Sequence, residues 1–218
     1  MIGFLRPGPG RRVQTEKMAL AGLRVLCAHV PQTKRGLAGA CRTLAKAGVR
    51  RVLIHRSLAG AALSHGLVPV DSGPLYRHMA HRLVLAHLMR SGLAPERAVI
   101  EFRGGGVSDE LYRAAVQLCP RVAQVRICAG PGSDRLRARL FRDFGMAAEL
   151  SAPADLILRF DGADGGEGLY LGPCLRTDGL KLARAGGEAE PNEVDAECLL
   201  CAQWQTGQVS EDNILIVY

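Results

Sequence analysis

Residues 97–128 read RAVIEFRGGGVSDELYRAAVQLCPRVAQVRIC, and this stretch decides the fold that the sequence predicts. A β-prone run at 97–102 is followed by a glycine loop, by a helical pattern that Ser108 can cap, and by a second β-prone run at 123–128. Strand, loop, helix and strand in this order make a βαβ unit. Such units build parallel sheets, so the stretch predicts an α/β protein.

The same order of elements occurs in two parts of the chain. Val25 and Val52 in the first pair of strands are 27 residues apart, as are Ala98 and Val125 in the second pair. We interpret the two parts as a duplicated βαβαβ unit. The first half is predicted to hold strands at 23–29, 51–55 and 67–70 and helices at 33–49 and 57–65, and the second half strands at 97–102, 123–128 and 154–160, an extended segment at 147–150 and helices at 108–119 and 133–144.

Two such halves predict a doubly wound fold. Residues 23–73 and 97–160 would be the halves. A long helix at 74–92 would cross between them, because Pro74 suits a first helical turn and Gly92 a helix end. The predicted fold class is α/β, with a Rossmann-like, mostly parallel sheet of strand order 3-2-1-4-5-6.

Both ends of the chain differ from this central domain at 23–160. Residues 1–22 begin with a Pro- and Gly-rich segment and show little periodicity, which is typical of a frayed N-terminal arm. Residues 161–218 hold 11 Asp and Glu against 3 Lys and Arg, with a Gly-rich stretch and short strand and helix candidates. We expect a small, acidic α+β appendage at the C-terminus that caps or extends the sheet.

Composition and hydropathy limit the class of protein. The chain has 218 residues, 48% of them hydrophobic, so it can bury a sizeable core. No apolar run approaches the roughly 18 residues that a membrane span needs, and the N-terminus lacks the apolar core of a secretory signal. The seven cysteines are odd in number and without framework spacing, so we expect reduced thiols, no structural disulfide and a cytoplasmic location.

Charge is distributed unevenly along the chain. Residues 1–100 carry 16 Lys and Arg against 3 Asp and Glu, whereas residues 101–218 carry 12 against 18. A basic half can bind nucleic acid, but only Phe4 and Tyr76 before residue 100 offer an aromatic ring for stacking on bases. We therefore keep nucleic acid as an alternative partner and not as the main one.

The carboxyl ends of the first strands of the halves are the expected binding place, because ligands of open α/β sheets bind where the strand order reverses. Glycines in such a loop let the backbone approach an anion, and a helix N-terminus presents free N–H groups. Asp109 stands where a G-x-G-x-x-G fingerprint needs its last glycine. The candidate residues, expected to converge on one crevice, are Arg103, Gly104, Gly105, Gly106 and Ser108 from one half and His29, Lys34 and Arg35 from the other.

Residues 98–160 resemble the nicotinamide-cofactor domain of the shikimate dehydrogenase and glutamyl-tRNA reductase type. The resemblance rests on strand, glycine loop, helix and strand in that order, then on LRARLFRDFG at 136–145 and on ADLIL at 154–158. It implies a Rossmann domain that binds NAD(P) or another nucleotide.

Other clusters of reactive residues are interpreted as structural. Cys198 and Cys201 are three residues apart in an apolar helix candidate, without a second pair or a histidine to complete a metal site. His78 and His81 fit the polar stripe of the long helix. No metal is predicted, and the sequence has no nucleophile elbow, Lys-bearing phosphate loop or H-E-x-x-H motif.

The leading hypothesis is a Rossmann-like protein that binds a small anionic ligand, a nucleotide or another phosphate-bearing molecule, with catalysis left open. One alternative is a non-catalytic interaction or scaffold protein that has lost the cofactor site. The other is nucleic-acid binding through the basic N-terminal half. The sequence leaves the substrate, the reaction and the oligomeric state undecided.

Overall fold

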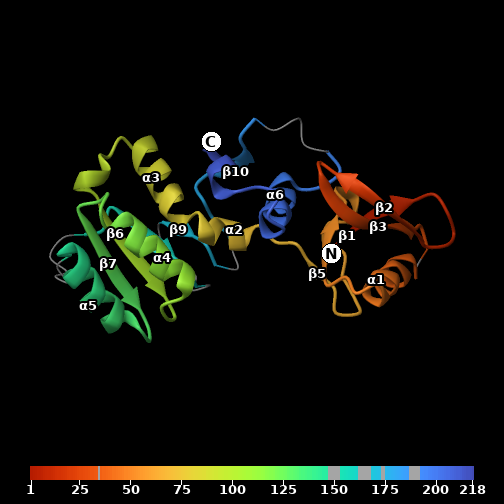
Figure 1. Cartoon of the computed structure of the whole chain (residues 1–218), viewed down its shortest axis with the longest axis horizontal. Coiled ribbons are helices and arrows are strands. Elements are labelled where there is room, and N and C mark those ends of the chain that lie inside the picture. Colours follow the sequence, from red (N-terminus) through yellow and green to blue (C-terminus); the bar gives the residue numbers. More distant parts are fainter. Residues whose placement is uncertain (34, 147–152, 162–167, 173–174, 187–191) are drawn as a thin grey trace. The chain divides into compact units, whose positions relative to one another are not determined.

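The computed structural model describes residues 1–33, 35–146, 153–161, 168–172, 175–186 and 192–218 (Figure 1). The chain divides into two compact units. Unit 1 comprises Met1–Ser72 and Ala183–Leu215, and unit 2 comprises Gly73–Leu182 and Ile216–Tyr218. The division therefore does not follow the boundaries predicted at 22 and 160.

Unit 1 is built on a five-stranded sheet. Its elements are β1 (Ile2–Gly8), β2 (Gln14–Leu20), β3 (Leu23–Pro31), α1 (Gly36–Lys46), β4 (Arg51–Ile54), the 3-10 helix η1 (Arg56–Leu58), β5 (Val68–Pro69), α6 (Ala196–Gln205) and the 3-10 helix η3 (Glu211–Asn213). The strand order is β2-β3-β1-β4-β5. All neighbouring strands are parallel except β2, which is antiparallel to β3 at one edge of the sheet.

The N-terminal strand β1 is the centre of this sheet. It pairs in parallel with β3 on one side and with β4 on the other, and Ile2, Phe4 and Leu5 are at most 7% exposed. The prediction of a frayed arm at 1–22 is therefore wrong. A strand that is buried on both faces is apolar without alternation, so its sequence gives no periodic signal.

The helix α1 covers one face of the unit 1 sheet. Leu5, Ala28 and Val52 come from three neighbouring strands and form a buried cluster with Ala40 and Leu44 of α1. Ala40 and Leu44 are four residues apart in α1, and Ala28 and Val30 of the same cluster are two apart in β3, as one buried face of each element requires. The predicted sequence of strand, helix and strand over 23–55 is confirmed.

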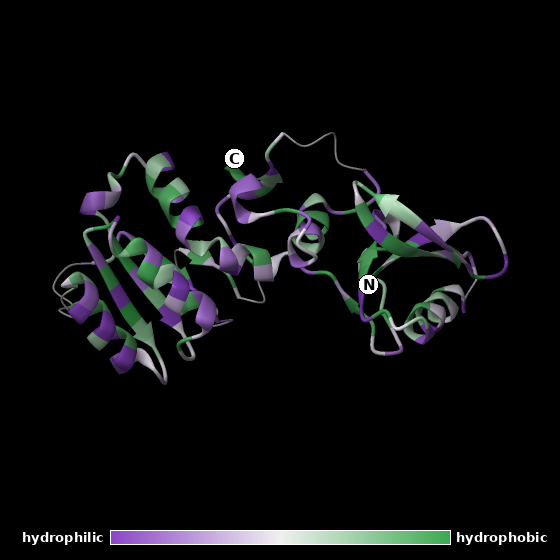
Figure 2. Ribbon diagram, viewed as in Figure 1, coloured by the Kyte–Doolittle hydropathy of each residue, from purple (hydrophilic) through white to green (hydrophobic). Residues whose placement is uncertain are grey.

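Unit 2 is built on a second, four-stranded sheet. Its elements are α2 (Gly73–His78), α3 (Ala80–Arg90), the 3-10 helix η2 (Pro95–Arg97), β6 (Val99–Gly104), α4 (Asp109–Leu118), β7 (Gln124–Ala129), α5 (Ser133–Phe144), β8 (Leu156–Arg159) and β9 (Leu169–Tyr170). The strand order is β7-β6-β8-β9, and all neighbours are parallel. Hydrophilic and hydrophobic residues alternate along its strands (Figure 2).

The two sheets are separate, so the prediction of one doubly wound sheet of order 3-2-1-4-5-6 is wrong. A strand has two edges, and those of β3 are taken by β1 and β2, whereas those of β6 are taken by β7 and β8. The first strands of the predicted halves therefore cannot be neighbours. The coarser prediction, an α/β chain with mostly parallel strands, is confirmed.

Several predicted elements change in extent. The long helix predicted at 74–92 is two helices, α2 and α3, which are interrupted at Met79. The helix predicted at 57–65 is only the single turn η1. Residues 183–215 belong to unit 1, so the predicted appendage at 161–218 is not one body, and β10 (Lys181–Arg184) pairs with β11 (Ile214–Val217) in a two-stranded sheet.

Two further findings concern features expected from composition. In the described ranges, no helix combines the length and the apolar character that crossing a bilayer requires. Six of the seven cysteines are described, and each of these six is a free thiol. Cys174 and the extended segment predicted at 147–150 lie outside the described residues.

Candidate functional site

The predicted glycine loop follows β6, and its glycines pack against the loop that follows β7. The N–H of Val107 donates to the carbonyl of Pro131 at 3.1 Å, and the N–H of Gly130 donates to the carbonyl of Gly104 at 3.0 Å. A Cβ on Gly130 would lie 2.2 Å from the oxygen of Gly105. The absence of side chains at these positions thus lets two backbone loops approach each other.

The N-terminus of α4 already holds a carboxylate of the chain. Ser108 caps the helix, because its hydroxyl oxygen accepts the N–H of Leu111 at 3.2 Å. The backbone N–H of Glu110 and then the Ser108 hydroxyl hold the pKa of the Glu110 carboxyl below its usual value. A free phosphate would compete with this carboxylate for the same end of the helix.

The other half of the predicted site lies in unit 1. His29 is in β3 and bonds to Glu16, Arg35 is exposed at the start of α1, and Lys34 lies outside the described residues. The prediction that the strands of His29 and Arg103 are neighbours is wrong, because they belong to different sheets. The shared crevice was inferred from that adjacency and loses its basis.

A different set of residues comes together at the carboxyl edge of the unit 2 sheet. In register, Arg103 of β6 lies beside Cys128 of β7 and Arg159 of β8, and Arg159 lies beside Tyr170 of β9. Residues in register on parallel strands point to the same face of the sheet. We call Cys128, Arg103, Arg159 and Tyr170 the arginine row.

A second row on the same face lies two residues earlier in the strands. Glu101 is in register with Arg126 and with Ile157, and both charged residues are buried at 8% and 6% exposure. Glu101 also forms an ion pair with Arg103. The opposite face holds apolar residues such as Phe102, so charge is confined to one face of this sheet.

Arg159 is the least compensated member of the arginine row. It is 8% exposed, and within the described part of the chain its Nε has no hydrogen-bond partner. Its guanidinium lies over the ring of Tyr170, 5.3 Å from the centroid, and Arg176 lies over the same ring at 4.4 Å. A buried guanidinium normally has a carboxylate or another acceptor, because burial of an uncompensated charge is costly.

The thiol of Cys128 shares these surroundings. Partial burial, followed by the negative charge of Glu101, raises its pKa, and the positive charges of Arg103, Arg137 and Arg126 oppose this shift. Cys128 is therefore a protonated thiol at neutral pH. It can donate weakly to a ligand of the row and is not an activated nucleophile.

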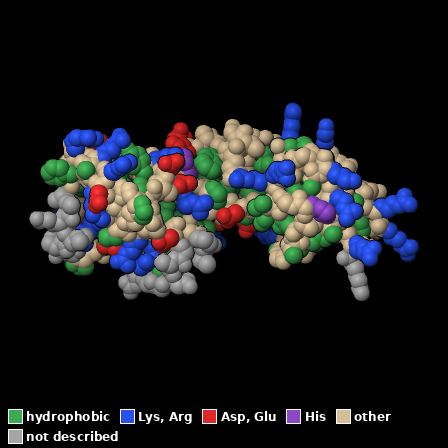
Figure 3. Space-filling model, turned by 90° about the horizontal axis from the view of Figure 1, so that it is seen from below, with side chains coloured by type: hydrophobic (Ala, Val, Ile, Leu, Met, Phe, Trp, Pro, Cys, Tyr) green, Lys and Arg blue, Asp and Glu red, His purple; other side chains and the backbone are tan. Residues whose placement is uncertain are grey.

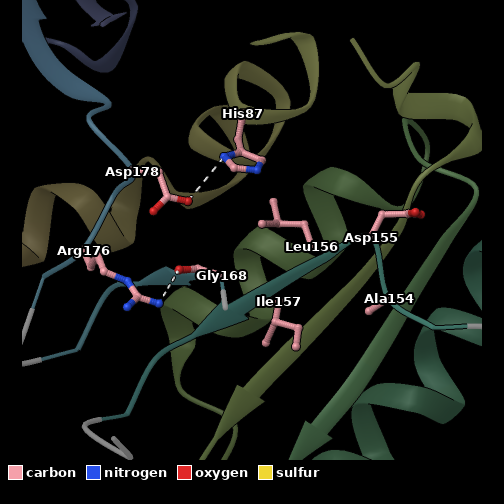
Figure 4. Close-up of a pocket in the computed structure, with 8 residues that line it drawn as sticks. All are labelled: His87, Ala154, Asp155, Leu156, Ile157, Gly168, Arg176 and Asp178. Atoms are coloured by element: carbon pink, nitrogen blue, oxygen red, sulfur yellow. Dashed lines mark hydrogen bonds and ion pairs between the residues drawn. The ribbon is translucent and has the colours of Figure 1, made fainter. Parts of the chain in front are cut away.

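Figure 4 shows a cavity of about 430 Å³ at the opposite, amino-terminal end of β8. Several of its polar groups bond to one another: His87 Nδ1 lies 3.8 Å from an oxygen of Asp178, and Arg176 donates to the carbonyl of Gly168 at 3.4 Å. Asp155 accepts the N–H of Val99 at 2.8 Å. These contacts hold strand ends together, so the cavity is a weaker candidate than the arginine row.

One group among the described residues could hold a metal ion, and it lies in unit 1. It consists of Glu16, Cys27 and His29, whose ligand atoms are within 4.8 Å of one another. Of these three residues, only His29 was predicted as a site residue. Glu16 lies within residues 1–22, for which the sequence predicted an arm, so its position opposite Cys27 was not expected. The turn at Ala21–Gly22 was the available signal, because a two-residue hairpin fixes which residues face each other.

The arginine row was missed for a related reason. Arg159 stands near the end of the run at 154–160, and Glu101 and Arg103 alternate with apolar residues at 99–103. The signal was this alternation of charge inside strands. A scan against known protein families finds no model that matches the chain, and a search of curated proteins finds no significant match.

Proposed function

We propose that the protein binds a small anionic ligand, of phosphate or carboxylate chemistry, at the carboxyl edge of the unit 2 sheet. Arg103 and Arg159 would be the charged donors, and the loop at 104–106 would border the ligand. The observation that carries the proposal is the buried guanidinium of Arg159, whose Nε lacks a hydrogen-bond partner among the described residues. An anion would supply the missing acceptor.

The position of the row supports this proposal. In the order β7-β6-β8-β9, the strand that follows β6 in the chain lies on one side of it, and β8 lies on the other. The chain order thus reverses at β6, and ligands of open α/β sheets bind outside the carboxyl ends of the strands at such a point. Arg103 and Arg159 stand at those ends of β6 and β8.

The charges of the two rows also favour an anion. The rows contain the guanidinium groups of Arg103, Arg126 and Arg159 and one carboxylate, that of Glu101. The ion pair between Glu101 and Arg103 lies on the same face as the guanidinium groups of Arg126 and Arg159. A phosphate or carboxylate group would reduce the repulsion between them, and a guanidinium can bind either group through two parallel hydrogen bonds.

The ligand class proposed from the sequence is retained at this new place. NAD(P) or another nucleotide would present its phosphate groups to Arg103 and Arg159. The glycine loop was predicted to bind the anion through its backbone. The N–H of Val107 and the carbonyl of Gly104 bond to the neighbouring loop instead, so the glycine loop would only border the ligand. Whether the bound molecule reacts is left open.

Isothermal titration of the full chain with inorganic phosphate, AMP, ATP and NADP tests the proposal. We expect binding of at least one probe, and the variant Arg159→Met to weaken it by roughly 10- to 150-fold, as for a lost hydrogen bond to a charged group. Arg142→Met is the matched control, because Arg142 is an exposed arginine of unit 2, with its side chain 73% exposed. No binding by any probe, or equal affinity in Arg159→Met, would overturn the proposal.

The nucleic-acid alternative has one observation in its favour. Residues 1–72 hold 12 Lys and Arg against 2 Asp and Glu, and Figure 3 shows basic side chains spread over this part of unit 1 with few acidic ones among them. Binding to a random DNA duplex that falls steeply with salt and is unchanged in Arg159→Met would favour this alternative.

A further inference from the structure

The hairpin of β2 and β3 in unit 1 brings three metal-ligating side chains to one face. Ala21 and Gly22 have φ of 46° and 85°, so they form a tight turn that pairs Leu20 with Leu23. This register places Glu16 directly opposite Cys27. His29 is two residues further along β3 and therefore points to the same face as Cys27.

The ligand atoms of these residues are close together and graded in exposure. His29 Nε2 lies 2.9 Å from Glu16 Oε1, and these two atoms and the Cys27 sulfur are all within 4.8 Å of one another. Cys27 is fully buried, whereas the side chains of His29 and Glu16 are 22% and 54% exposed. The thiol of this group is thus buried, while the imidazole and the carboxylate are partly exposed, so that an ion can enter from the solvent.

The backbone and the neighbouring charges suit this arrangement. A Cβ on Gly8 of β1 would lie 2.7 Å from the Cβ of His29, so glycine there leaves the room that His29 occupies. Arg6 is in register with His29, and its Nη2 lies 3.7 Å from a carboxylate oxygen of Glu193. Burial, together with the charges of Glu16 and Glu193, raises the pKa of Cys27 to about 11 against the opposing effect of Arg6. The thiol is thus protonated without a metal.

We propose that Glu16, Cys27 and His29 bind one Zn²⁺ ion in unit 1, with a fourth position open to water or an anionic donor. A thiolate, a neutral imidazole and a carboxylate are ligands that Zn²⁺ accepts, and three protein ligands with one open position are typical of reactive zinc sites. Binding breaks the S–H bond of Cys27 and forms a Zn–S bond, and the proton passes to the solvent. The two negative ligands then balance the charge of the ion.

The hydrogen bond between His29 and Glu16 is compatible with a metal at this place. The present distance of 2.9 Å between the two atoms is shorter by about 0.4 Å than the separation of two ligands around a tetrahedral ion with bonds of about 2.0–2.1 Å. To admit the ion, the two side chains would exchange this hydrogen bond for bonds to a shared metal position. A histidine–glutamate pair above a buried thiol can also exist without a metal, so the test must detect the bond between sulfur and metal.

Titration of the tag-free, full-length chain with Co²⁺, and then displacement by Zn²⁺, makes this bond visible. We expect one equivalent of Co²⁺ to give the thiolate-to-cobalt charge-transfer band together with the intense visible bands of a tetrahedral site. Addition of Zn²⁺ should remove both signals. A cobalt spectrum without the thiolate band would overturn the proposal.

Variants assign the signal to these residues. Cys27→Ser should abolish the charge-transfer band, and His29→Gln, at a partly exposed position, should lower the Zn²⁺ affinity by more than roughly tenfold, the loss that even an altered outer partner of a metal site produces. Lys17→Gln on the neighbouring strand position and Cys128→Ser in unit 2 are the matched controls and should change neither. Circular dichroism without metal checks that each variant is folded. A thiolate band that persists in folded Cys27→Ser, or an unchanged affinity in folded His29→Gln, would refute the site.

Discussion

The central strands of the two units, β1 and β6, differ in where they place polar groups. β1 is buried at Ile2, Phe4 and Leu5 on both of its faces, and its first charged residue is Arg6 near the carboxyl end. β6 alternates instead, with Glu101 and Arg103 on one face and apolar residues on the other. The central strand of unit 1 therefore has its charge only near the carboxyl end, whereas the central strand of unit 2 has the buried charge of Glu101, and a buried charge without compensation is destabilising.

This difference in the central strands corresponds to a difference in where each unit could bind a ligand. In unit 1 the buried strand supports a hairpin at the edge, where Glu16, Cys27 and His29 meet. In unit 2 the sheet itself presents Arg103 and Arg159 at the carboxyl edge. Changes to the two central strands should thus have different consequences.

The largest expected effect comes from truncating the core of β1. Phe4 is fully buried, so Phe4→Ala should lower the free energy of unfolding of unit 1 by about 3–5 kcal/mol. Hydrogen exchange should accelerate in β3 and β4, which flank β1, and Phe102→Ala should act in the same way on β7 and β8. Phe141→Ala is the control, since that side chain is 63% exposed. Unchanged exchange in β3 and β4 would show that the N-terminus is an arm after all.

Removing the buried carboxylate of β6 tests the other side of the comparison. Glu101→Gln keeps the shape of the side chain but removes the negative charge that pairs with Arg103. We expect unit 2 to lose about 1–3 kcal/mol of stability, because a buried charge-assisted hydrogen bond is lost among like charges. Glu96→Gln, an exposed carboxylate of the same unit, should be neutral in the same urea titration. Equal stability of the two variants would mean that the face is not held by this ion pair.

These contrasts also explain what the sequence predicts well. Local elements follow from local patterns: the helix expected at 133–144 has those bounds, and Gly145 ends it with φ of 68°. The pairing of strands does not follow from local patterns, because it depends on which strand edges remain free. Once residues 2–8 and 14–20 occupy the two edges of β3, the predicted pairing of 23–29 with 97–102 is excluded.

The candidate site was predictable only in part. Gly105 and Gly106 lie in a loop at a strand end as predicted, whereas Gly104 is the last residue of β6, and the packing of this loop against Gly130 depends on a loop after the next strand. Arg159 follows three apolar residues and looks like a charge at the end of a strand. In the structure it is buried, and its guanidinium lies over the ring of Tyr170 from a later strand, a contact that no local pattern predicts.

A smaller effect of opposite sign is expected at Arg159 in the absence of ligand. Replacing a poorly compensated buried charge by an apolar side chain of similar length often stabilises a protein, by about 1 kcal/mol or more. Arg159→Met should therefore raise the stability of unit 2 without ligand while it weakens anion binding. Urea unfolding with and without the bound probe separates the two effects. Destabilisation of the ligand-free protein would show that Arg159 is already compensated within the fold.

The smallest effect concerns Ser108, which the sequence predicts both as a helix cap and as a ligand-site residue and which caps α4 in the structure. If Ser108 acts only as a cap, Ser108→Ala should cost about 1 kcal/mol of stability and Ser108→Gly only a few tenths, because glycine is a tolerated capping residue. Asp195→Ala, which removes the matching cap of α6 in unit 1, should cost a similar amount. Both Ser108 variants should bind the anionic probe with nearly unchanged affinity, since the hydroxyl oxygen accepts the N–H of Leu111 and Glu110 occupies the end of the helix. A loss of affinity in folded Ser108→Gly would return the serine to the ligand site and extend the arginine row to the start of α4.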